Sequence, residues 1–171
     1  MRLEKMANTV TRWFVAYGFF IIGFAIPSSG DPVRVFIHEL GHAIFGLGTI
    51  EGTHTVSILD WFPTHIGSLI STTAAAWLIA RYGTRIFPYL GLTGVGWAVR
   101  NTAQVFFEDG GEYGADMKTL TALWYPTALI CLGVVITTYI KEKRKWQVQR
   151  TSKGQDREPE TRTAPQGRCL G

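Results

Sequence analysis

Two histidines and a glutamate in the run His38-Glu39-Leu40-Gly41-His42 have the residue types and the spacing of a zinc site. Residues four apart lie on the same face of a helix, so His38 and His42 can offer their imidazole nitrogens to one ion. Glu39 stands beside them, where a carboxylate can take a proton from a metal-bound water. This H-E-x-x-H pattern predicts Zn²⁺ bound by His38 and His42, with Glu39 as the general base.

The third protein ligand of such a site must come from elsewhere in the chain, because catalytic zinc uses three protein ligands and a water. The metzincin extension is absent, since Phe45 and Gly48 stand where it requires glycine and histidine. The acidic stretch 108–116 supplies the carboxylate candidates. The other reading of the motif is a pair of core histidines that hydrogen-bond to each other within a helix.

Composition places the motif in strongly apolar surroundings. The chain has 171 residues, 46% of them hydrophobic, and a net charge of +4 whose basic residues gather towards the two ends. Several apolar stretches approach the 17 to 25 residues of a membrane-spanning helix. We therefore expect an all-α polytopic integral membrane protein with about five transmembrane helices, near residues 13–27, 31–48, 68–82, 87–107 and 117–140. The alternative for residues 13–27 is a secretory signal.

Between the second and third of these helices the pattern changes. Residues 50–67 contain β-branched and aromatic residues around turn formers, which predicts a short strand-like segment after the motif helix. Small residues in the fourth helix, Gly91, Gly94, Gly96 and Ala98, predict close helix contacts. Residues 1–140 then form one membrane-embedded domain, and residues 141–171 a basic, disordered tail. Basic residues that flank apolar spans mark topology, so the expected surroundings are a lipid bilayer and not nucleic acid.

The apolar run Phe36-Ile37-His38-Glu39-Leu40-Gly41-His42-Ala43-Ile44 resembles the site-2 protease family of intramembrane zinc metalloproteases. The resemblance covers residues 33–139, and only the HELGH part is highly specific. It implies His38 and His42 as ligands, Glu39 as general base, and a downstream aspartate that completes the site.

Two aspartates fit that implied third ligand. Asn101 precedes Asp109-Gly110-Gly111 at the family's spacing, although the family's prolines are missing. Asp116 opens the last helix, as an aspartate does in smaller members of the family, and is slightly preferred. Weaker candidates are Glu108, Glu112, His54 and His65. Asn101 is a candidate for holding a substrate backbone.

The expected function is a zinc metalloprotease that hydrolyses peptide bonds of a membrane protein or peptide substrate. The substrate must be extended before attack, and residues 53–62 can pair with it as an added strand. The alternative is a non-catalytic scaffold or chaperone that keeps the fold. A geometric difficulty accompanies both. If the helices between residues 31 and 107 all span, the acidic loop starts far from the motif and must dip inward.

Overall fold

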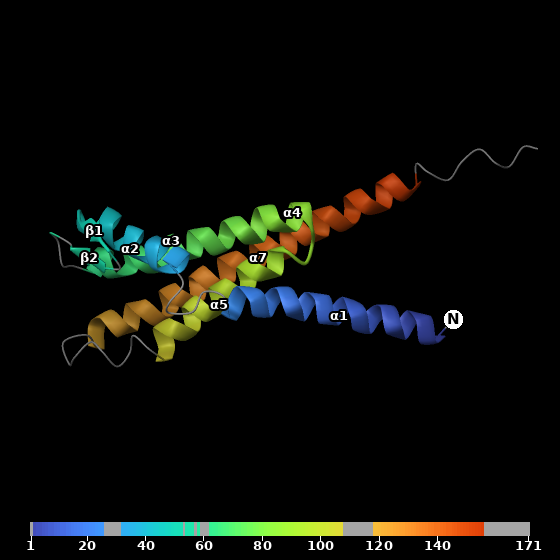
Figure 1. Cartoon of the computed structure of the whole chain (residues 1–171), viewed down its shortest axis with the longest axis horizontal. Coiled ribbons are helices and arrows are strands. Elements are labelled where there is room, and N and C mark those ends of the chain that lie inside the picture. Colours follow the sequence, from blue (N-terminus) through green and yellow to red (C-terminus); the bar gives the residue numbers. More distant parts are fainter. Residues whose placement is uncertain are drawn as a thin grey trace, which may run out of the picture.

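The structure is a computed structural model, and it describes residues 2–25, 32–52, 54–56, 58, 62–107 and 118–155. Helices dominate, and two short strands form a hairpin (Figure 1). In chain order the elements are α1 (Arg2–Ala25), α2 (Pro32–Gly46), β1 (Thr49–Glu51), β2 (His54–Val56), α3 (Phe62–Leu78), the π-helical turn η1 (Ile79–Gly83), α4 (Thr84–Ile86), α5 (Gly91–Phe107) and α7 (Lys118–Gln155).

Helices α3, α5 and α7 form the centre of the molecule. At one end Leu69, Val105 and Ala128 pack together, one from each helix. At the other end the shared cluster is Ala76, Ala80, Val95, Ala98, Val135 and Tyr139. Because residue numbers rise along α3 and α7 and fall along α5 between these clusters, α5 runs antiparallel to the other two.

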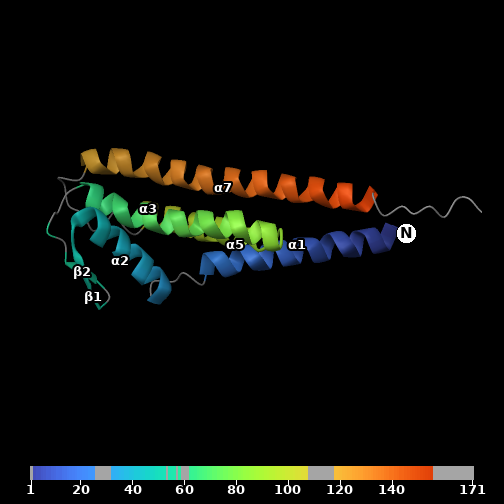
Figure 2. The ribbon, with the colours of Figure 1, turned by 90° about the horizontal axis from the view of Figure 1, so that it is seen from above.

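Helix α1 packs along α5 at glycines. A Cβ atom on Gly23 would overlap the backbone carbonyl of Thr93, and one on Gly96 would overlap that of Phe20. Gly94 lies equally close to Ala76 on α3. The prediction that these small residues permit close helix contacts is confirmed at Gly94 and Gly96. Figure 2 shows α1 and α7 extending towards the same end of the molecule.

The hairpin follows α2, as the change of pattern after the motif predicts. Strands β1 and β2 pair antiparallel, with Ile50 opposite Thr55 and Glu51 opposite His54. Gly52 follows β1 with a φ of 66°, the left-handed region in which glycine avoids a Cβ clash. Strand β2 lies against α2, where the Thr55 hydroxyl donates a hydrogen bond of 2.9 Å to the Glu39 carbonyl.

The expectation of a polytopic membrane protein is wrong. A spanning helix needs about 20 predominantly apolar residues. Helix α2 has 15 residues, and α3 and α5 have 17 each. Helices α1 and α7 are longer, but within the described residues no helix combines the length and the apolar character that crossing a membrane requires. The expected localisation as a multi-pass integral membrane protein is wrong for the same reason.

Helix α7 continues past Ile140, where we expected the last helix to end, and reaches Gln155. Residues 141–155 of the expected tail are therefore helical, and residues 156–171 lie outside the described residues. The helix continues as a regular α-helix through a charged stretch because that stretch consists mainly of good helix formers such as lysine, glutamate, arginine and glutamine.

An ion-pair cluster joins α4 to α7. Arg85 Nε donates to Glu142 Oε2 and Lys145 Nζ donates to Glu142 Oε1, each at 2.9 Å. The Glu142 side chain is 8% exposed. Hydrogen bonds from Arg85 and Lys145 lower the pKa of Glu142 from 4.5 to about 2, against the opposing effect of burial.

This cluster predicts an acid-dependent stability. The folded-state pKa of Glu142 lies below its unfolded value, so its contribution is complete above about pH 4.5 and is lost as the pH falls towards 2. Urea denaturation of the wild type and Glu142→Gln should give a difference in unfolding free energy that shrinks across this window. The difference in unfolding free energy between the wild type and Arg85→Gln should shrink in the same way. A difference that stays constant down to pH 2 would contradict the assignment.

Candidate metal centre

The two motif histidines face each other on α2. Their Nε2 atoms lie 3.2 Å apart, and their rings are inclined at 75° with centroids 4.8 Å apart. With Zn–N distances of about 2.0–2.1 Å, two nitrogens on a tetrahedral ion are about 3.3 Å apart. The observed separation therefore suits two ligands of one zinc ion, and it also suits a hydrogen bond between the rings.

Burial sets the protonation state of His38. Burial, followed by the nearby His42 and Arg34, lowers the pKa of His38 from 6.5 to about 4, against the opposing charge of Glu39. The imidazole is therefore neutral at pH 7. Neutral imidazole is the form that binds a metal, because a protonated ring has no free nitrogen lone pair.

The backbone on either side of His38 is held by two neighbouring elements. Ser71 of α3 donates its hydroxyl to the Ile37 carbonyl at 2.7 Å, and Thr55 of β2 donates to the Glu39 carbonyl. A carbonyl oxygen has two lone pairs, so each can accept these bonds beside its helical one. Helix α2 is thus fixed in rotation at the position where the motif faces α3 and α5.

A small cavity of about 20 Å³ opens beside His38. That volume is enough for about one water molecule. Polar side chains from two helices line it, and these are Ser68, Thr72, Asn101 and Gln104. Asn101 is 5% exposed, and its Nδ2 finds no hydrogen-bond partner in the part of the chain that the structure describes. The cavity therefore offers a buried amide donor close to the predicted metal site.

The other predicted residues are placed less completely. Asp109 and Asp116, with Glu108 and Glu112, fall in residues 108–117 and so lie outside the described residues. His54 is exposed on β2, and nothing is described of the His65 side chain. Among the residues that are described, no group of three histidine, cysteine, aspartate or glutamate side chains is placed to hold a metal. Of the predicted site residues that the structure describes, His38, Glu39 and His42 lie together on α2, and Asn101 lines the cavity beside His38.

Three polar residues that line the cavity were not among the residues predicted from the sequence. Ser68, Thr72 and Gln104 line the cavity with His38. Ser68 and Thr72 are four residues apart on α3, which puts both hydroxyls on one face of the helix. That spacing alone does not distinguish them from Ser71 and Thr73 on the same helix. Gln104 follows Asn101 by three residues on α5, but nothing local shows that this face of α5 turns towards the motif.

Helix α2 approaches α3 through two glycines. A Cβ on Gly41 would overlap the Gly67 carbonyl, and a Cβ on Gly67 would overlap the Gly41 carbonyl. We expect Gly41→Ala to lower the unfolding free energy by about 1–3 kcal/mol, the usual cost of overpacking. Gly18→Ala is the matched control, because no atom lies within 4 Å of its added Cβ. Urea denaturation followed by circular dichroism measures both. Equal stability of the two variants would show that this contact yields easily.

Comparison of the chain with protein-family models, with curated proteins and with solved structures finds no match. The resemblance to the site-2 proteases therefore depends on the motif residues alone. What the site can do must be argued from its own geometry.

Proposed function

We propose that the protein is a zinc-dependent peptidase in which His38 and His42 bind the ion and Glu39 is the general base. The observation that carries the proposal is the 3.2 Å between the two Nε2 atoms, which suits one tetrahedral ion. Three further features support it: the lowered pKa of His38, the water-sized cavity next to it, and the adjacent carboxylate of Glu39.

The third ligand in this proposal is an aspartate of residues 108–117. Val105 lines the cavity with His38, and Asp109 follows the last residue of α5, Phe107, by two residues, about 7 Å of extended chain. Asp116 precedes Lys118, which lies about 15 Å along α7 from Ala128, a neighbour of Val105. The shorter connection to the cavity makes Asp109 the preferred third ligand in this proposal.

A bound zinc ion supplies a Lewis acid and lowers the pKa of a coordinated water. The chain's own contribution is proton transfer and orientation. A carboxylate oxygen of Glu39 accepts a proton from the attacking water and returns it to the nitrogen of the leaving amine. Asn101 lines the cavity beside His38, and its Nδ2 has no hydrogen-bond partner among the described residues. This amide can therefore donate a hydrogen bond to the scissile carbonyl oxygen.

Zinc content tests the ligands. The purified wild type should contain about one zinc per chain, as a single catalytic site requires. His38→Ala and His42→Ala should each lose it, and so should Asp109→Ala or Asp116→Ala, whichever removes the third ligand. His54→Ala is the matched control, since it removes an exposed imidazole from β2. Zinc retained in His38→Ala, or lost equally in His54→Ala, would overturn the site.

Glu39→Gln separates a peptidase from a non-catalytic scaffold. The substitution keeps the side-chain shape and removes the base, so zinc should stay while peptide hydrolysis falls by about 100-fold or more. Cleavage of an unstructured peptide library, read by mass spectrometry, measures this. A wild type that binds zinc but cleaves no better than Glu39→Gln would contradict peptidase activity.

A further inference from the structure

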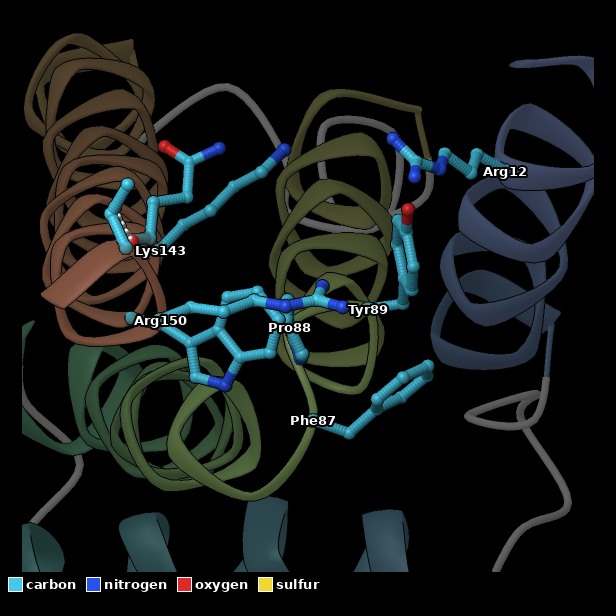
Figure 3. A pocket seen from close by; sticks show the side chains of 9 residues that line it. Arg12, Phe87, Pro88, Tyr89, Lys143 and Arg150 are labelled. Atoms are coloured by element: carbon cyan, nitrogen blue, oxygen red, sulfur yellow. Dashed lines mark hydrogen bonds between the residues drawn. The ribbon is translucent and has the colours of Figure 1, made fainter. Parts of the chain in front are cut away.

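A second, larger pocket lies far from the metal centre. Its volume is about 740 Å³, within the range of about 300–1,000 Å³ typical of small-molecule sites. It lies between α1, the loop before α5, and the part of α7 beyond Tyr139 (Figure 3). Trp146 in this pocket is about 27 Å along α7 from Ala128, which packs beside the metal centre. The two sites are therefore separate.

One face of α7 supplies most of the pocket. Lys143, Gln147 and Arg150 follow each other at spacings of four and three residues, and Thr151 comes four residues after Gln147, which puts these side chains on the same side of the helix. Arg12 projects from α1 on the opposite wall. Figure 3 shows the side chains of Arg12, Lys143 and Arg150 directed into the space between the two helices.

The charge of the pocket is strongly positive. Three cationic side chains line it, Arg12, Lys143 and Arg150, and no carboxylate of the described residues does. Glu142 is next to Lys143 in sequence, but its carboxylate is bonded to Arg85 and Lys145 on the other side of α7. Those groups line a separate cavity of about 310 Å³, with Trp146 between the two. Three cations in one concave site favour a ligand with several negative charges.

Aromatic side chains form the rest of the wall. Phe87 is 42% exposed and meets Tyr89 edge to face, with ring centroids 5.3 Å apart. The Arg150 guanidinium lies 5.3 Å from the centre of the Trp146 ring, and this cation–π contact favours its position along the pocket wall. Planar aromatic faces and pre-positioned guanidinium groups are the means by which proteins bind bases and phosphates.

We propose that this pocket binds a nucleoside di- or triphosphate, with Arg12, Lys143 and Arg150 on the phosphates and the aromatic side chains against the base. The site does not depend on the proposed peptidase activity, because it shares no residue with the metal centre. The cationic side chains favour a ligand with phosphates, and the aromatic side chains favour one with a planar base, so the pocket suits a molecule that has both.

Isothermal titration with ATP, adenosine and inorganic tripolyphosphate tests both halves. ATP should bind, and adenosine and tripolyphosphate should each bind about tenfold or more weakly than ATP, because each lacks one half of the contacts. Absence of ATP binding at millimolar concentration would overturn the proposal. If tripolyphosphate binds as tightly as ATP, the aromatic side chains do not contact the base, and the proposal is overturned too.

Matched charge variants on α7 test the location. Lys143→Gln and Arg150→Gln should each weaken ATP binding about tenfold. Lys141→Gln removes the same charge about 160° around the helix from Lys143 and should change binding less than about twofold. Thermal unfolding of each variant checks that the fold is intact, which is expected because Lys141 and Arg150 are exposed. Equal losses in Lys141→Gln and Lys143→Gln would show general attraction to a basic helix and overturn the pocket.

Discussion

The direct contact of the α2 and α3 backbones at Gly41 and Gly67 determines where the motif histidines of the candidate metal centre lie. No side chain separates the helices there, since a Cβ on either glycine would overlap the opposite carbonyl. This closeness lets the Ser71 hydroxyl reach the Ile37 carbonyl, one residue before His38. A wider helix spacing would break that bond and allow α2 to rotate, so the glycine of the motif, Gly41, is needed to hold the two histidines in place.

The same contact explains how the end of α5 reaches the motif. Helix α2 pairs with only the first part of α3, and α5 returns antiparallel along α3. Asn101 and Val105 therefore lie level with His38 and line its cavity. The difficulty raised by the sequence assumed that the helices between residues 31 and 107 all span a membrane. No described helix can do so, and Val105, near the end of α5, lines the cavity beside His38.

Sequence reasoning succeeded where the signal was local and failed where it was not. The motif spacing on one helix face, the hairpin after it, and the close contacts of Gly94 and Gly96 all follow from short-range geometry. The membrane assignment failed because an apolar run of 15 to 17 residues in a packed bundle looks much like a short spanning segment. The polar face of Ser68 and Thr72 became informative only once Asn101 was placed opposite it.

The basic stretch near the end of α7 shows why charge alone is a poor guide to role. In sequence, the lysines and arginines after Ile140 form one cluster, which we interpreted as a mark of topology. In the folded helix they separate by face. Lys145 joins the ion pairs of Glu142, whereas Lys143 and Arg150 turn towards α1. Trp146 lies between the two groups, so one helix both fastens α4 and forms a cationic wall.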